Sequence, residues 1–170
     1  MRTKNFEIIN FLEITEKEWD QILAVHLKGV MFGCQVFGKQ MLEQGAGSII
    51  NIRSASAGPT LSKAFTYSVA KAGLAQLARI AALELAGDSI RVNTVHPNSV
   101  FDTGIWSEQV LASRAKHYGM SIEEYRSSNL LGVEVTSKDV ASVVCALAGT
   151  EFSRTTGAQV PVDGGADRVI

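Results

Sequence analysis

The sequence predicts an α/β domain in which helices flank a parallel sheet. Short apolar runs of strand length alternate along the chain with longer segments whose apolar residues recur at helical spacing. This alternation favours parallel strands joined by right-handed crossovers. The 170 residues are 46% hydrophobic and 19% charged, which is the composition of an ordinary globular domain. We therefore expect a single domain, residues 1–170, with three clear strands.

The first long helix is expected over residues 15–44. Thr15 and Glu18 have the spacing of a capping box, and apolar positions then follow at helical intervals until a glycine pair at 45 and 47. Three glycines lie inside this segment and are expected to permit close helix packing: Gly29, Gly33 and Gly38.

A strand and a second helix come next. The isoleucine-rich run SIINI at 48–52 predicts a buried strand, and residues 65–86 predict a helix that is apolar nearly all round. An uncovered apolar edge strand promotes aggregation, so another segment should cover SIINI. Residues 6–10, FEIIN, are the nearby candidate for this fourth strand.

The second half of the chain predicts two more strands and three more helices. The strands are expected at 90–95 (IRVNTV) and 158–162 (AQVPV), and the latter precedes a glycine pair. The helices are expected at 107–117, 121–128 and 136–148, and 121–128 opens with a capping-box spacing.

Bulk properties narrow the class of protein. The net charge of −1 gives no electrostatic case for nucleic acid or an acidic membrane surface. No stretch has the apolar length that spans a bilayer, and Glu7 and Glu13 interrupt any signal-peptide core. Cys34 and Cys145 form no CxxC pair and are expected to be buried free thiols. With no cluster of metal ligands in view, these features favour a soluble cytoplasmic protein.

The stretch YSVAKAG at 67–73 carries the clearest chemical signal. Tyr67 and Lys71 would lie on one face of a helix. A phenol has a pKa of about 10, and a nearby ammonium lowers it towards the range of acid–base catalysis. Ser54 follows the strand at 48–52, where a parallel sheet presents its ligands, and could hydrogen-bond a substrate oxygen. Taken alone, however, the tyrosine–lysine spacing is common and is typical of two surface residues.

Further motifs accompany this pair in a fixed order: Ser54, YSVAKAG at 67–73, RVN at 91–93 with Pro97, TG at 156–157 and VDGG at 162–165. In this order and spacing, from about residue 13 to the end, the chain resembles the short-chain dehydrogenase/reductase family. The resemblance implies a partial Rossmann-like, doubly wound parallel sheet. It also implies NAD or NADP as cofactor, without indicating which, and a small-molecule substrate.

The resemblance also implies roles for individual residues. Tyr67 is similar to the general acid/base, and Lys71 to the residue that lowers its pKa and binds the nicotinamide ribose. Ser54 resembles the residue that orients the substrate oxygen, and Ser56 is a competing serine in the same loop. His26 stands where the family has a proton-relay asparagine. It is either a substitute in that relay or a histidine in the apolar stripe whose ring bonds a backbone carbonyl.

Two later segments resemble the cofactor loop and the lid of the family. The cofactor contacts would come from Pro97, Val100 and Thr103, although Asn98 replaces the usual glycine and Thr103 lies one residue later than the family's threonine. Residues 104–132 resemble the substrate-binding lid. The sequences of the lid and of the C-terminal tail are similar to those of the dehydrogenase part of bifunctional aldolase/short-chain dehydrogenases. This similarity implies a sugar-derived or small hydroxy-aldehyde substrate.

The largest departure from the family is a missing motif. The glycine-rich turn that holds the cofactor pyrophosphate does not occur in this sequence, so residues 1–170 resemble a truncated domain. We therefore expect an NAD(P)-dependent oxidoreductase for an alcohol or carbonyl that is weak or inactive as this isolated chain. The alternatives are a non-catalytic paralogue or oligomerisation module, and a nucleotide-binding half supplied by another chain. A homo-oligomer through 15–44 and 65–86 is expected.

Overall fold

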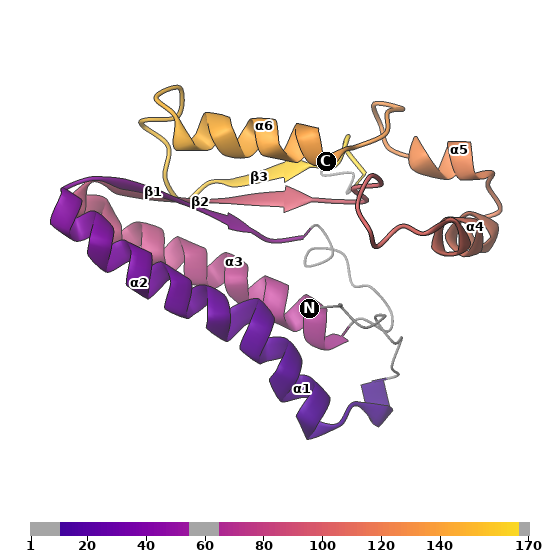
Figure 1. Ribbon diagram of the computed structural model, residues 1–170, viewed down its shortest axis with the longest axis horizontal. Coiled ribbons are helices and arrows are strands. Elements are labelled where there is room, and N and C mark those ends of the chain that lie inside the picture. Colours follow the sequence, from indigo (N-terminus) through magenta and orange to yellow (C-terminus); the bar gives the residue numbers. More distant parts are fainter. Residues whose placement is uncertain (1–10, 55–64, 167–170) are drawn as a thin grey trace.

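The computed structural model describes residues 11–54 and 65–166 and has three layers (Figure 1). A parallel sheet forms the middle layer, α1, α2 and α3 cover one face, and α6 covers the other. The strands lie in the order β1 (Gly47–Ile52), β2 (Ile90–Pro97) and β3 (Gln159–Val162). The predicted α/β class and the three strands are confirmed, and β2 continues for two residues beyond the range predicted for it.

The helix predicted over 15–44 is present but is not uniform. The Thr15–Glu18 capping box opens it, and Gly45 ends it in the left-handed conformation at φ 77°. A π-helical turn divides it, so that its parts are α1 (Glu16–Leu23), η2 (Ala24–Lys28) and α2 (Gly29–Gln44). A short 3-10 turn, η1 (Phe11–Glu13), precedes it.

The remaining helices follow the predicted order. The helix expected at 65–86 is α3 (Phe65–Leu85), which is followed by the 3-10 turn η4 (Ala86–Asp88). The three later helices are α4 (Glu108–His117), α5 (Ile122–Arg126) and α6 (Ser137–Ala148). The capping box at Ser121 and Glu124 is present, but α5 ends two residues before the predicted boundary. Figure 1 places α4 and α5 beyond the carboxyl ends of the strands.

The core lies between α3 and the middle of the sheet. Ala78 and Ala82 of α3 pack with Ile90 and Val92 of β2, and all four are buried. Small side chains on α3 let the helix lie close to the strand, and branched side chains on the strand fill the space. This packing fixes α3, and with it the YSVAKAG turns, against the sheet.

Strand β1 lies at one edge of the sheet. Within the described residues it pairs with β2 alone, in the register Ile49↔Val92. The candidate fourth strand at 6–10 lies outside those residues. A groove of about 330 Å³ runs between α2 and β1, and nine residues line it: Val30, Gly33, Cys34, Phe37, Met41, Ser48, Ile49, Ile50 and Asn51.

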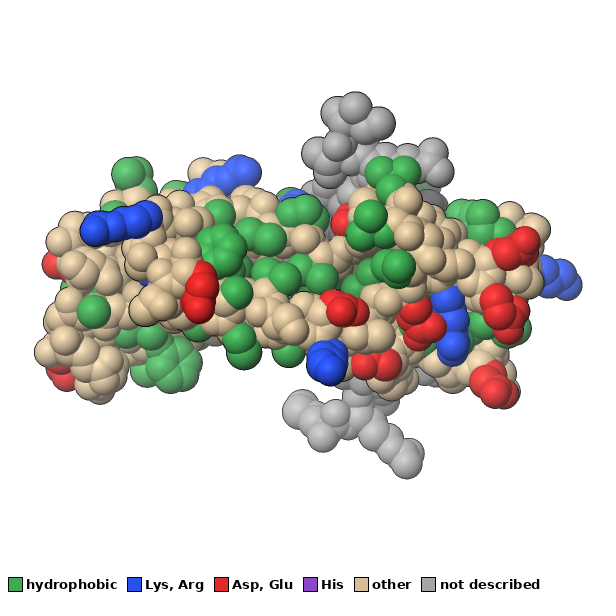
Figure 2. Space-filling model, turned by 90° about the horizontal axis from the view of Figure 1, so that it is seen from above, with side chains coloured by type: hydrophobic (Ala, Val, Ile, Leu, Met, Phe, Trp, Pro, Cys, Tyr) green, Lys and Arg blue, Asp and Glu red, His purple; other side chains and the backbone are tan. Residues whose placement is uncertain are grey.

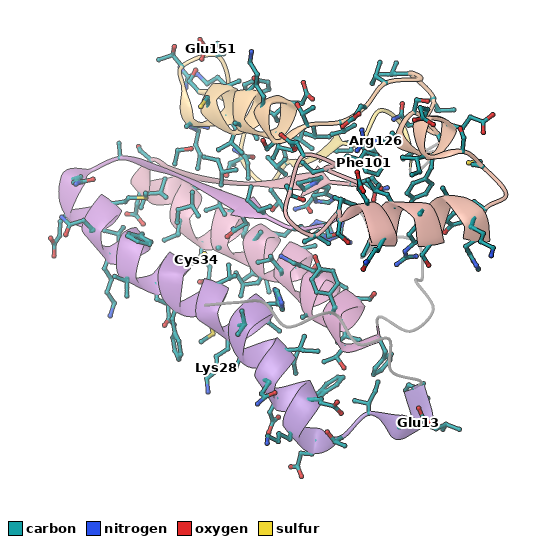
Figure 3. The ribbon with its side chains drawn as sticks, turned by 45° about the vertical axis from the view of Figure 1, so that its right-hand side comes forward. Glu13, Lys28, Cys34, Phe101, Arg126 and Glu151 are labelled. Atoms are coloured by element: carbon teal, nitrogen blue, oxygen red, sulfur yellow. The ribbon has the colours of Figure 1, made fainter. Side chains whose placement is uncertain are left out.

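The cysteine and glycine predictions hold only in part. Figure 3 labels Cys34 on α2; its thiol is half-buried and lies 3.7 Å from Asn51 Oδ1, while Cys145 is exposed. Burial of both thiols was therefore a wrong expectation, because α6 presents Cys145 to solvent. A Cβ at Gly38 would lie 3.8 Å from Leu85, in ordinary contact, whereas at Gly33 it would meet no described atom within 4 Å.

The surface over α6 mixes apolar and charged side chains. Figure 2 shows apolar groups along the middle of this face and acidic groups gathered at the end that holds α4 and α5. None of the described helices has the length and hydropathy to cross a membrane.

Candidate active site

The predicted chemical residues meet at the carboxyl edge of the sheet. Ser54 lies two residues beyond β1, Pro97 ends β2, and Asp163 follows β3. The carboxyl ends of parallel strands lie on the same side of a sheet, which is where α/β proteins bind ligands. Tyr67 and Lys71 reach this edge from the first turns of α3.

Tyr67 is half-buried and its phenol is hydrogen-bonded to the Ser54 side chain. Burial raises the pKa of the Tyr67 phenol because it disfavours the phenolate, and the bond with Ser54 acts in the opposite direction. The lowering expected from Lys71 is not among these effects and stays a prediction. The structure therefore joins the two residues that were predicted to share the substrate oxygen.

Lys71 is buried at 9% exposure and lies one helical turn beyond Tyr67. Its ammonium donates a 2.9 Å hydrogen bond to the Ile52 carbonyl, and Nζ lies 5.7 Å from the centroid of the Tyr67 ring. Burial lowers the pKa of the Lys71 ammonium. Lys71 thus ties α3 to the end of β1 and places a positive charge beside the phenol.

His26 lies on η2, and its ring meets Tyr67 edge to face, with centroids 5.1 Å apart at an angle of 84°. Among residues 11–54 and 65–166, the His26 ring forms no hydrogen bond, so the alternative of a carbonyl-bonded histidine finds no partner there. Burial and the charge of Lys71 lower the pKa of His26, which favours the neutral ring. The contact with Tyr67 is compatible with a relay role.

The predicted cofactor loop follows β2. The Thr103 hydroxyl donates to the Val100 carbonyl at 2.8 Å, so it closes the loop on itself. Ser99 has a φ of 49°, in the left-handed region, and the Asn98 amide donates to Val162 O at 3.3 Å. Ser56, the competing serine, lies outside the described residues.

The donor set at this edge fits the nicotinamide end of a dinucleotide. The Lys71 ammonium and the Tyr67 hydroxyl are groups that bind ribose hydroxyls, and the backbone of the loop around Val100 offers partners for a carboxamide. The glycine-rich motif that usually binds the pyrophosphate does not occur in the sequence. The fit therefore covers the reacting end of the cofactor.

An aromatic cluster lies between the cofactor loop and the predicted lid. Phe101 packs against Trp106 and Tyr125, with ring centroids 4.8 and 5.7 Å apart, and Tyr118 stacks on Tyr125 at 5.7 Å. Figure 3 shows Phe101 and Arg126 close together at this end of the molecule, and both line one small cavity. The cluster holds α4 and α5 against the loop.

Three polar residues near this edge were not predicted from the sequence. Arg53 directly precedes Ser54, and its Nη1 lies 2.9 Å from His96 Nδ1. His96 Nε2 in turn lies 2.6 Å from Gln159 Oε1. The one available signal was a pair of polar residues, His96 and Gln159, inside apolar strands, which indicates buried hydrogen bonding.

Comparison with known proteins identifies the family of this chain. A family model described as Enoyl-(Acyl carrier protein) reductase matches residues 3–167. L-2,3-butanediol dehydrogenase of Corynebacterium glutamicum is 37% identical over 164 residues, 94% of this chain and 63% of its own length. Galactitol 2-dehydrogenase of Cereibacter sphaeroides is 31% identical over 91% of this chain and 59% of its own length. The chain belongs to the short-chain dehydrogenase/reductase family.

Solved structures show the same likeness. Sorbitol-6-phosphate 2-dehydrogenase of Erwinia amylovora has a TM-score of 0.83 at 25% identity, over 94% of this chain and 64% of that one. A candidate 2-deoxy-D-gluconate 3-dehydrogenase of Agrobacterium tumefaciens with bound NADP has a TM-score of 0.81 at 30% identity, over 92% and 61%. This chain spans less than two thirds of the length of these relatives.

Proposed function

We propose that this chain forms the catalytic part of an NAD(P)-dependent oxidoreductase that interconverts an alcohol and a carbonyl. The observation that carries the proposal is the Tyr67 phenol, which is bonded to Ser54 and lies beside the Lys71 ammonium at the carboxyl edge of the sheet. A nicotinamide bound there would supply the hydride acceptor or donor. The names of the relatives support a small diol or polyol as substrate.

Tyr67 would carry the proton. In oxidation its phenolate takes the proton of the substrate hydroxyl, and in reduction its hydroxyl protonates the carbonyl oxygen. Ser54 would hold that same oxygen, since its side chain is already bonded to the phenol. The charge of Lys71 would favour the phenolate, and neutral His26 would pass the proton onward. Residues 104–132 would close over the substrate.

The isolated chain is proposed to bind cofactor weakly and to turn over slowly. Its sequence lacks the glycine-rich turn, and β1 presents a free edge beside the groove against α2, within the described residues. Both features support a further segment at that edge, on this chain or another, that would complete the nucleotide site. The substrate class implied by the aldolase-linked resemblance, a sugar-derived or small hydroxy-aldehyde, stays a prediction.

Self-association is proposed through the helices on the lower layer of Figure 1. Large apolar side chains remain exposed on α2 and α3: Phe32, Val36 and Phe37 on the former, and Val69, Ile80 and Leu83 on the latter. Exposed apolar clusters of this kind mark contact surfaces on proteins. A homo-oligomer would bury them, and a non-catalytic assembly role would use the same surface.

The deciding experiment compares tyrosine variants of the purified chain. Tyr67→Phe keeps the ring and removes the exchangeable proton, and Ser142→Ala, which removes a hydroxyl from the exposed face of α6, is the control. With butane-2,3-diol or galactitol and NAD or NADP, Tyr67→Phe should lose activity about 100-fold or more while the control keeps it. Equal rates in all three proteins would refute the role of Tyr67.

Cofactor binding gives a second readout that does not need turnover. NADH or NADPH fluorescence should show weak binding that weakens further in Lys71→Met, while Lys39→Met, at an exposed site on α2, leaves it unchanged. Binding that is indifferent to Lys71→Met would remove Lys71 from the cofactor site.

A further inference from the structure

Lys71 and the end of β1 hold each other by two reciprocal hydrogen bonds. The Lys71 ammonium donates to the backbone carbonyl of Ile52 at 2.9 Å. In the other direction, Arg53 Nε donates to the backbone carbonyl of Lys71 at 3.2 Å. Two consecutive residues, Ile52 at the end of β1 and Arg53 directly after it, therefore hold a single residue of α3 from both sides. A clasp of this kind fixes the distance between the strand end and the helix.

The Arg53 side chain is itself braced across the sheet. Its Nη1 lies 2.9 Å from His96 Nδ1 on β2, and His96 Nε2 lies 2.6 Å from Gln159 Oε1 on β3. The Gln159 amide nitrogen donates onward to Thr94 Oγ1 at 3.2 Å. The chain of bonds therefore runs from α3 through all of the described strands. His96 is 9% exposed, so water competes little for these groups.

The chemistry of these groups allows a single protonation state of His96. A guanidinium only donates hydrogen bonds, so His96 Nδ1 must accept from Arg53 and carry no proton. The proton then resides on Nε2, which donates to Gln159 Oε1. The amide orientation agrees, because Gln159 uses its nitrogen to donate to Thr94. His96 is thus a neutral ring with a fixed tautomer.

The charges around His96 favour this neutral state. Burial is the main cause that lowers the pKa of His96, and the positive charges of Arg53 and Arg79 add to it. Asp163 and the hydrogen bond to Gln159 act in the opposite direction. A protonated ring would turn a second N–H donor towards the guanidinium and break the brace.

We infer that Arg53, held by neutral His96, is a positioning residue that keeps Ser54 within hydrogen-bond reach of Tyr67. Ser54 follows Arg53 in the chain, and Tyr67 lies one helical turn before Lys71, so the clasp between Arg53 and Lys71 sets the separation of the other two. The inference rests on the proposed function for the importance of that pair. Its geometry is tested without any turnover.

The first test reads the His96 tautomer by long-range ¹⁵N NMR of the folded chain. The chain has three histidines, so assignment by a His96→Gln variant is direct. We expect an unprotonated Nδ1 and a protonated Nε2 at neutral pH in the unmodified chain. Arg53→Met should give mixed tautomers, whereas Arg79→Met removes a nearby positive charge without removing a bond to the ring and should leave the tautomer intact.

The second test reads Tyr67 in chains labelled at tyrosine ¹³Cζ, where the three tyrosines are assigned by Tyr67→Phe. At the highest pH that preserves the native circular dichroism spectrum, Arg53→Met should lower the ratio of ionised to neutral Tyr67 about fivefold, the effect of one ordinary hydrogen bond. Arg53→Lys keeps the positive charge but not the planar guanidinium, so its ratio of ionised to neutral Tyr67 should lie between those of Arg53→Met and the unmodified chain. Arg79→Met should match the unmodified chain.

Three results would overturn the inference. They are a protonated Nδ1 in the unmodified chain, an Arg53→Met spectrum that matches Arg79→Met, and an unchanged Tyr67 titration in Arg53→Met. If Arg53→Met does not fold, the same comparisons are made with Arg53→Lys. If the His96 tautomer and the Tyr67 titration behave as expected but turnover does not depend on Tyr67, the proposed function is refuted and the positioning role of Arg53 stands.

Discussion

Asn51 and Asn93 are both buried on neighbouring strands, but they differ in the bonding of their amides. Asn93 Nδ2 donates to Thr155 O at 2.9 Å and its Oδ1 accepts from the Ala158 amide at 3.0 Å. Asn51 Nδ2 has no partner within the described residues. Asn93 therefore locks the loop before β3 to the sheet, whereas Asn51 keeps a buried, unpaired donor beside the groove between α2 and β1.

This contrast predicts opposite responses to the same substitution. Asn93→Leu orphans a buried N–H and a buried C=O and should cost about 2 kcal/mol or more of unfolding free energy. Asn51→Leu removes an unsatisfied donor and should be neutral or stabilising by up to about 1 kcal/mol. Urea denaturation of the chain measures both. Similar losses in the two variants would mean that the Asn51 amide is satisfied in solution.

Two helix-interior glycines predict a second contrast. A Cβ at Gly73 would lie 3.2 Å from Leu27 on η2, whereas at Gly33 it would meet no described atom within 4 Å. Gly73→Val should cost about 1–3 kcal/mol by overpacking. Gly33→Ala should stabilise α2 by up to about 1 kcal/mol through helix propensity. Thermal or urea unfolding checks the signs, and a stable Gly73→Val chain would show that η2 yields easily.

Two histidines, the half-buried His26 and the buried His96, set a pH dependence. The pKa values of His26 and His96 are lowered in the folded chain, so below about pH 6.5 the unfolded chain binds more protons. Stability should therefore be full above that pH and fall as the pH drops through the lower native values. Urea unfolding between pH 7 and pH 5 should show this slope, and His26→Asn should reduce it. Stability that rises on acidification would contradict the assignment.

The exposed apolar faces predict the behaviour of assembly variants. Leu83 on α3 is 81% exposed, and Leu131, in the predicted lid, is 74% exposed. A charge inside a helix-to-helix contact is costly to bury, so Leu83→Glu should shift the chain towards monomer. Leu131→Glu is the matched control and should leave assembly unchanged. Sedimentation velocity at micromolar concentration distinguishes the two, and a monomeric unmodified chain would refute the proposed interface.

The helices and strands could be predicted from the sequence because the patterns that indicate them are local. The capping box at Thr15 and the isoleucine run of β1 depend on a few neighbouring residues, and the structure confirms both. The π turn at 24–28 depends instead on how the long helix meets α3. Local spacing cannot reveal it, since the same residues fit an unbroken helix.

The candidate site likewise contains residues that a local motif predicts and one whose role depends on distant contacts. Ser54, Tyr67, Lys71 and His26 were selected by motif, and the structure brings them together at one edge. No role for Arg53 was predicted, because a polar residue directly after a strand is common and its hydrogen-bond partners are not visible in the sequence. Its partners, the Lys71 carbonyl and His96, are 18 and 43 residues away in sequence. Contacts of that range come from the folded chain alone.

The π turn absorbs one extra residue without changing the direction in which either end of the long helix faces. On its amino-terminal side, α1 turns Trp19 towards Phe65, with ring centroids 5.8 Å apart, while α2 on the other side lies along β1. The wider turn spreads nearly the same rotation over one more residue than an α-helical turn does, so α1 and α2 keep their relative phase. Deleting one residue from 24–28 would therefore restore a regular α-helical turn and leave Trp19 facing Phe65. A deletion between Trp19 and this turn would instead rotate Trp19 by about 100°, so 24–28 is the part of the helix that tolerates a change of one residue in length.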